Sequence, residues 1–170
     1  MCLPDEENEI TGPLRDNHRS RQQKPVYNYL NVKRWTRNEN IFELKRLFFP
    51  THLHGGNHWF AIIVDIEMKK LICYDSLRGS GGNVTYMNNT KNWLNDEHRT
   101  RYGVDINWEG WTEANAACPK QNNGCDCGVF TMMFIDLYSG GFPVDWFSQK
   151  DIAFFRVKIA ADVLRGSVAY

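Results

Sequence analysis

Residues 58–75 read HWFAIIVDIEMKKLICYD and contain two apolar runs that are rich in β-forming residues. The runs are residues 59–65 and 71–75, and a polar turn separates them. This pattern predicts a β-hairpin. Because the start of one strand and the end of the next are neighbours in a hairpin, we expect His58 and Asp75 to lie side by side. A carboxylate in that place can orient an imidazole, although an ordinary edge histidine and a strand-ending aspartate fit the same positions.

Further elements can be predicted on both sides of the hairpin. Residues 85–101 are expected to form a helix with Trp93 and Leu94 on its inner face. Ser148 and Asp151 form a capping box that opens a final helix. The other expected elements are a strand or short helix at 26–32, strands at 47–50 and 108–111, and a buried helix from about 127 to 138. Helices and strands alternate without a βαβ rhythm, so the predicted class is α+β.

The composition is typical of an ordinary globular domain and argues against nucleic-acid-binding, membrane-spanning and secreted proteins. Of 170 residues, 42% are hydrophobic and 24% are charged, which suits one domain with a sizeable core. Twenty basic and twenty acidic residues cancel, so charge predicts neither a nucleic acid nor a membrane as partner. The longest purely apolar run, residues 60–64, is too short to cross a bilayer. The polar N-terminus has no signal-peptide core, so we expect an intracellular protein in a reducing compartment.

The five cysteines are an odd number, and reduced thiols are the default without a secretory signal. One residue separates Cys125 from Cys127, whereas two or more separate the paired cysteines of a zinc knuckle. The sequence has no second pair of closely spaced cysteines. His52, His54 and His58 lack a partnering Cys or Glu pair. We therefore expect no metal and no cofactor.

Residues 121–128, QNNGCDCG, place a cysteine at a junction between a loop and a helix. The segment before Cys127 is rich in turn formers, and the apolar run after it predicts a helix. A helix N-terminus favours a thiolate, and a backbone N–H there can face a developing oxyanion. The alternative is that Cys127 is a small buried hydrophobe, as most cysteines are, and local features alone favour that interpretation.

Several motifs together resemble the SUMO-specific (sentrin-specific) cysteine proteases. Residues 121–128 resemble the family's Q-x-N-G-x-D-C-G box, and His58-Trp59 and Tyr74-Asp75-Ser76 resemble its H-W and Y-D-S motifs. The order His, Asp, Gln, Cys along the chain is also the family's order. Two flanking stretches are similar to family motifs as well, namely V-K-R-W-T at 32–36 and F-x-Q…F-R at 147–156. The resemblance covers about residues 26–165.

The resemblance implies a cysteine-proteinase fold with a central mixed β-sheet flanked by helices, and a role for each matched residue. Cys127 would attack the carbonyl at the end of the Gly-Gly tail of a SUMO-like protein, and His58 would take the thiol proton and later return it to the leaving amine. Asp75 would hold the imidazole. The Gln121 side chain and the Cys127 backbone N–H would form the oxyanion hole. Trp59 would press on the diglycine tail, although a plain core tryptophan is the other interpretation.

The family's N-terminal helical segment has no counterpart before Val26. We therefore expect that this segment is missing, that residues 1–25 are a polar, disordered tail, and that residues 26–168 form a truncated catalytic domain. The family's W-L-N-D-E string occurs here at residues 93–97, where we interpret it as a coincidence and Trp93 as a core residue.

The expected function is a thiol protease that processes SUMO precursors or deconjugates SUMO. We expect a nuclear or cytoplasmic monomer whose partner is SUMO or a related ubiquitin-like protein. Two alternatives stay open. One is a module that binds a ubiquitin-like protein with little or no turnover, against which the intact His, Asp, Gln and Cys argue. The other is a relative specific for NEDD8 or another ubiquitin-like protein.

Overall fold

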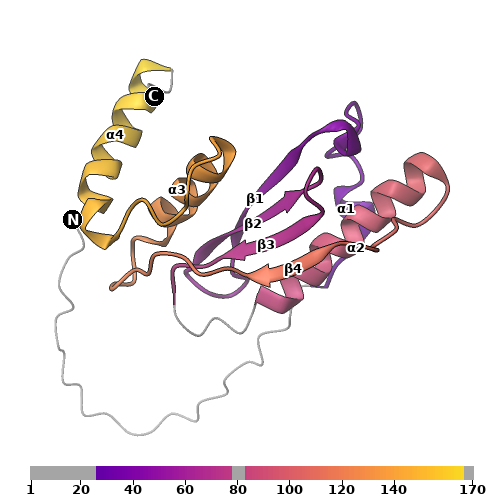
Figure 1. Cartoon of the computed structure of the whole chain (residues 1–170), viewed down its shortest axis with the longest axis horizontal. Helices are drawn as coiled ribbons and strands as arrows, with labels where there is room; N and C mark the ends of the chain where they lie inside the picture. The colour runs from indigo at the N-terminus through magenta and orange to yellow at the C-terminus, as the bar shows by residue number, and fades with distance from the viewer. Residues whose placement is uncertain (1–25, 78–82, 167–170) are drawn as a thin grey trace, which may run out of the picture.

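The computed structural model of the chain describes residues 26–77 and 83–166. Its centre is a four-stranded sheet with the order β1-β2-β3-β4 (Figure 1). Strands β1 to β3 are antiparallel neighbours, whereas β4 pairs parallel to β3, so the sheet is mixed as predicted. The strands are β1 (Arg46–His52), β2 (Trp59–Asp65), β3 (Lys70–Tyr74) and β4 (Thr112–Asn115).

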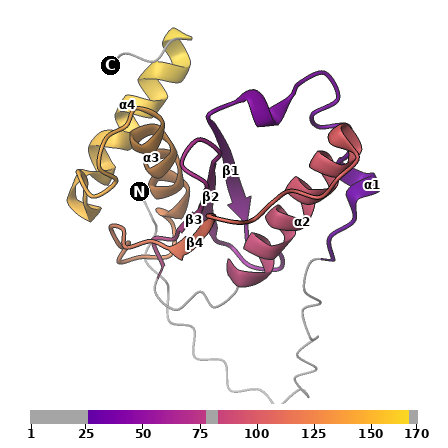
Figure 2. The ribbon, with the colours of Figure 1, turned by 45° about the vertical axis from the view of Figure 1, so that its right-hand side comes forward.

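Helices cover both faces of the sheet. Helix α2 lies on one face and α3 on the other, and α4 lies outside α3 (Figures 1 and 2). The helices are α1 (Tyr29–Val32), α2 (Asn83–Tyr102), α3 (Cys127–Ser139) and α4 (Ile152–Arg165), with short 3-10 helices η1 (Ile41–Glu43) and η2 (Gln149–Asp151). The arrangement is the predicted α+β class, with a mixed sheet between helices.

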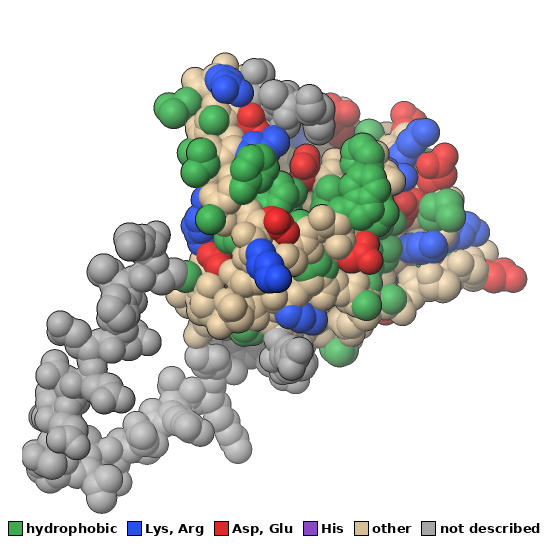
Figure 3. All heavy atoms as spheres, turned by 60° about the vertical axis from the view of Figure 1, so that its left-hand side comes forward, with side chains coloured by type: hydrophobic (Ala, Val, Ile, Leu, Met, Phe, Trp, Pro, Cys, Tyr) green, Lys and Arg blue, Asp and Glu red, His purple; other side chains and the backbone are tan. Residues whose placement is uncertain are grey.

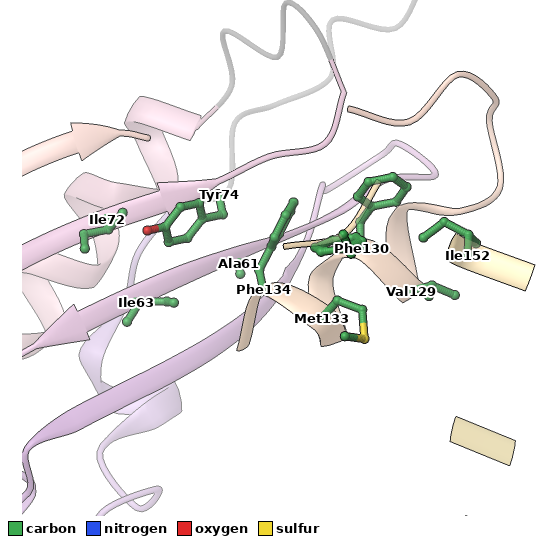
Figure 4. Packing of buried hydrophobic residues seen from close by; sticks show 10 residues of the cluster. Ala61, Ile63, Ile72, Tyr74, Val129, Phe130, Met133, Phe134 and Ile152 are labelled. Carbon is green, nitrogen blue, oxygen red and sulfur yellow. The ribbon is translucent and has the colours of Figure 1, made fainter. Parts of the chain in front are cut away.

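Successive side chains of β2 and β3 point to opposite faces of the sheet and divide the core into two clusters. The side chains on one face pack with α3, and those on the other face pack with α2. The α3-side cluster (Figure 4) consists of Ala61, Ile63, Ile72, Tyr74, Val129, Phe130, Met133, Phe134, Phe147 and Ile152. The α2-side cluster consists of Ile41, Phe60, Ile62, Val64, Leu71, Cys73, Met87, Trp93 and Leu94. Because both faces of β2 are buried, this strand reads as a continuous apolar run.

The structure confirms most of the expected elements and corrects two. The hairpin, the helix over 85–101, the helix beginning at Cys127 and the Ser148 capping box are all present. The strand predicted at 108–111 is wrong, because the two tryptophans there contact each other in a turn and β4 begins only at Thr112. The strand around 47–50 exists, but it is longer and only half-buried, since β1 is the edge of the sheet.

The outer face of the molecule beyond α3 is formed by α4. It carries apolar side chains among charged ones (Figure 3), and Phe154, Val157 and Val163 are exposed. Within the described ranges, no helix is both long and apolar enough to cross a membrane. The predicted tail of residues 1–25, the glycine-rich loop at 78–82 and the last residues of the predicted domain, 167–168, lie outside the described residues.

Candidate active site

The hairpin brings His58 and Asp75 together as predicted. In the register of β2 and β3, Tyr74 lies opposite Ala61, so the chain leaving β3 runs beside the start of β2. His58 Nε2 and Asp75 Oδ1 are 2.7 Å apart, and both side chains are buried. An ionised carboxylate can only accept, so Nε2 carries the hydrogen and donates it. The lone pair of the imidazole is therefore on Nδ1, and this atom can act as a base.

The Asp75 carboxylate has two further donors that fix its position. The backbone N–H of Leu77 donates to Oδ1 at 2.8 Å, and the side-chain amide of Asn83 donates to Oδ2 at 3.0 Å. Asn83 is the first residue of α2. Together with His58, these donors hold the buried carboxylate in one orientation. Asp75 can therefore orient the His58 ring and stabilise an imidazolium.

The segment before α3 is hydrogen-bonded to the residues that follow β3. The Gln121 N–H donates to the Ser76 carbonyl at 3.0 Å, and the Ser76 hydroxyl donates to Gln121 Oε1 at 2.6 Å. Lys120 Nζ donates to the Asp75 carbonyl at 2.6 Å, and the Cys118 thiol contacts the same oxygen at 3.2 Å. These bonds place the Gln121 side chain, the predicted oxyanion donor, next to the residues that position the imidazole.

Cys127 is the first residue of α3 and carries a free thiol that is 6% exposed. Its place at a helix N-terminus is the one predicted, where unpaired backbone N–H groups face outward along the axis. Among the described residues, the thiol makes no hydrogen bond to the His58 ring. In structures without substrate, the hydrogen bond between a nucleophile and its base is often long, and it tightens only when substrate binds.

The other cysteines are less suited to nucleophilic chemistry. Burial, with a smaller effect of the nearby Asp75 charge, raises the pKa of the Cys73 thiol to about 12. Burial also raises the pKa of the Cys118 thiol. A thiol with a raised pKa is a poor nucleophile near neutral pH. Cys125 is disulfide-bonded, so the expectation that all thiols are reduced is wrong for this residue.

Asp126, immediately before the candidate nucleophile, links the loop to the C-terminal helices. Its Oδ2 accepts from Asn123 Nδ2 at 2.6 Å and from Gln149 Nε2 at 2.7 Å. Its Oδ1 pairs with Arg156 of α4 at 2.5 Å. Burial alone would raise the pKa of Asp126, but these three donors outweigh burial and lower it. Asp126 is thus an anion whose donors come from both its own loop and the segment of η2 and α4.

Trp59 is 40% exposed, which excludes the interpretation of a core tryptophan. It is the first residue of β2, directly after His58, and its ring lies 4.8 Å from the ring of His52. An exposed indole beside the candidate base can contact a substrate. Trp93, in contrast, is buried in the α2-side cluster, in agreement with its interpretation as a core residue. The described residues contain no group of three or more His, Cys, Asp or Glu side chains arranged to hold a metal ion.

The mixed sheet between helices and the buried His58–Asp75 pair agree with the predicted class, a cysteine protease domain. The Ulp1 protease family, C-terminal catalytic domain, matches residues 11–167. This match spans most of the chain, and the chain therefore belongs to the Ulp1 protease family.

Individual relatives agree with this assignment. The chain is 32% identical over 139 residues to Sentrin-specific protease 2 of Pongo abelii, a match that covers 80% of this chain and 23% of the relative. It is 33% identical over 144 residues to the Putative ubiquitin-like-specific protease 1B of Arabidopsis thaliana, covering 82% and 41% of the two chains. The matched stretch is thus only part of the length of these relatives.

A solved structure shows the same fold. It contains the C-terminal Ulp1 protease domain in complex with Smt3, the yeast ortholog of SUMO. The TM-score is 0.68 at 28% sequence identity, and the match covers 81% of this chain and 61% of that one.

Several residues around the site were not assigned a role from the sequence. No sequence pattern predicts the contact between Asn83 and Asp75, because Asn83 lies eight residues after Asp75, beyond a glycine-rich loop. Ser76, Gln149 and Arg156 belong to motifs that were recognised, but their contacts depend on how distant segments pack.

Proposed function

We propose that this chain is a thiol peptidase that cleaves after the C-terminal Gly-Gly of a SUMO-like protein, in precursors, in isopeptide conjugates or in both. The observation that carries the proposal is the buried pair of His58 and Asp75 at one end of the sheet. Ser76, the next residue after Asp75, is hydrogen-bonded to Gln121. Cys127 follows six residues later, at the first turn of α3. Base, orienting acid, oxyanion donor and nucleophile are thereby supplied by two adjoining segments.

In the first half of the proposed reaction, His58 Nδ1 takes the thiol proton of Cys127 and the sulfur attacks the glycine carbonyl carbon. Negative charge then develops on the carbonyl oxygen, where Gln121 Nε2–H and the Cys127 backbone N–H donate to it. The C–N bond breaks, and the imidazolium returns its proton to the leaving amine. The product is a thioester on Cys127.

In the second half, neutral His58 removes a proton from water, and the hydroxide attacks the thioester carbon. The same two donors stabilise the second oxyanion. Collapse of this intermediate breaks the C–S bond and releases the glycine carboxylate, and the imidazolium gives its proton to the Cys127 sulfur, which regenerates the thiol and neutral His58. The Asp75 carboxylate stabilises the imidazolium in both halves without becoming protonated.

Trp59 is proposed to flank the substrate tail. An indole face close to the base leaves room for glycines, whereas a side chain on either of the last two residues would clash with it. That one relative has been solved with Smt3 supports a SUMO-like partner. Such a substrate would place the enzyme in the nucleus or cytoplasm.

A panel of ubiquitin-like proteins with electrophilic C-termini tests the proposal. SUMO, NEDD8 and ubiquitin probes are each incubated with the chain, and covalent adducts are detected by mass spectrometry. We expect an adduct with SUMO at Cys127, and cleavage of a SUMO precursor by the same preparation. Labelling by NEDD8 alone would contradict the SUMO assignment, and tight SUMO binding without an adduct would indicate a binding module.

A further inference from the structure

Ser76 lies directly after the candidate orienting acid and is 1% exposed. Its hydroxyl donates to Gln121 Oε1 at 2.6 Å, while its carbonyl accepts from the Gln121 backbone N–H at 3.0 Å. The serine therefore holds both the backbone and the side chain of Gln121. No other role for the hydroxyl follows from the proposed reaction.

A glutamine amide has two different ends, and only one of them can stabilise an oxyanion. The oxygen of Gln121 faces the Ser76 hydroxyl, and Nε2 donates one hydrogen to the Asn123 carbonyl at 2.6 Å. If the amide were rotated by 180°, its oxygen would face the Asn123 carbonyl oxygen, and two acceptors would meet. The two contacts together thus select one orientation and leave the second hydrogen of Nε2 for a ligand.

We propose that Ser76 is a positioning residue that sets the orientation of the Gln121 amide as an oxyanion donor. The inference rests on the proposed function. It also assigns neighbouring residues to the two parts of the chemistry, since Asp75 orients the base and Ser76 orients the oxyanion donor. A donor that is already oriented needs no reorganisation when charge develops, which is the source of its effect on rate.

A double-mutant cycle on cleavage of a SUMO precursor tests the proposal. Ser76→Ala should lower kcat about tenfold with KM little changed, because the amide is then free to rotate. In the Gln121→Ala background, the same substitution should change kcat less than about twofold. Ser139→Ala, which removes a hydroxyl bonded to the Asp136 carbonyl at the far end of α3, is the matched control and should leave kcat unchanged.

If Ser76→Ala lowered kcat by the same factor in the Gln121→Ala background as in the wild type, the proposal would be overturned, because the serine would then act through another group. A Ser76→Ala variant with wild-type kcat would also overturn it. Ser76→Cys provides a second variant if Ser76→Ala melts at a lower temperature than the wild type. Its thiol nearly keeps the volume of the serine side chain but is a weak hydrogen-bond donor. This variant should lower kcat in the same direction.

A second measurement needs no substrate and separates this proposal from the proposed function. The side-chain amide of Gln121 gives a pair of ¹⁵N–¹H signals, which can be assigned by their absence from Gln121→Ala. We expect these signals to shift or broaden in Ser76→Ala and to stay in place in Ser139→Ala. Unchanged Gln121 signals in Ser76→Ala would overturn the inference whether or not the chain cleaves SUMO. Shifted signals would support it even if SUMO is not cleaved.

Discussion

The two halves of the candidate site are held in different ways. His58 and Asp75 belong to a hairpin, and the backbone ladder between β2 and β3 sets their distance. Gln121 and Cys127 belong to a loop and a helix start, and side chains from distant segments set their position. We call these the hairpin half and the loop half. The hairpin half is fixed by local pairing, whereas the loop half depends on contacts that can be removed one at a time.

This difference predicts how each half fails. Substitutions in the hairpin half should remove chemistry and leave the fold unchanged, since the ladder does not need the side chains of His58 or Asp75. Substitutions around the loop half should affect geometry and stability together, because Asp126 connects the loop to α4. Single substitutions in each half test this contrast.

The largest effect is expected for the nucleophile itself. Cys127→Ser should abolish labelling by a SUMO electrophile and lower precursor cleavage by about 10⁴-fold or more. Cys125→Ser should still be labelled, because its side chain lies outside the proposed chemistry. Labelling is measured by intact mass under reducing conditions. An adduct that survives Cys127→Ser would remove Cys127 from the site.

Asp75→Asn tests the hairpin half. An asparagine side chain can present its NH₂ group to Nε2, which favours the imidazole tautomer with its hydrogen on Nδ1, and it cannot stabilise an imidazolium. We expect kcat to fall by about 10³-fold or more, with the melting temperature and the SUMO affinity close to wild type. If activity also stayed close to wild type, another group would have to orient His58.

Gln121→Ala tests the loop half at the transition state. The loss of one oxyanion donor typically costs about 10²–10³ in kcat, and we expect KM to change little. Steady-state kinetics on a SUMO precursor separate the two parameters. A rise in KM with an unchanged kcat would mean that Gln121 binds substrate rather than the oxyanion.

The hairpin half could be predicted from sequence because it depends on local patterns. Two β-rich runs joined by a short turn already place His58 beside Asp75, whichever family the chain belongs to. The start of α3 at Cys127 was predictable for a similar reason, as turn formers are followed by an apolar run. The strand expected at 108–111 was wrong because aromatic residues favour strands on average, whereas these two tryptophans pack on each other in a turn.

The loop half could not be predicted in the same way. Motif resemblance named Gln121, but the direction of its amide depends on Ser76, which is 45 residues away. The link between Asp126 and Arg156 spans 30 residues and exists only because α4 packs outside α3. Contacts of this kind follow from tertiary packing, and a periodic pattern carries no information about them.

The smallest effect on activity, and the most specific effect on stability, is expected at Arg156. Asp126 has a lowered pKa in the folded chain, so the unfolded chain binds more protons as the pH falls. The stabilisation by this carboxylate is complete above the ordinary aspartate value of about 3.9 and is lost as the pH drops through the folded pKa. Arg156→Ala removes the cation and one donor but leaves the burial, so the folded pKa of Asp126 should rise.

The acid unfolding midpoint of Arg156→Ala should therefore move to higher pH than that of the wild type, while kcat at neutral pH falls only a few fold. Circular dichroism along a pH titration measures the midpoint. Lys158→Ala is the matched control, because it removes an equal charge from α4, where Lys158 pairs with Asp162 of the same helix. An equal shift in Lys158→Ala would mean that net charge, rather than the bond to Asp126, sets the acid stability. A shift confined to Arg156→Ala would show that the contacts of Arg156 with the loop, above all its ion pair with Asp126, contribute to the acid stability of the chain.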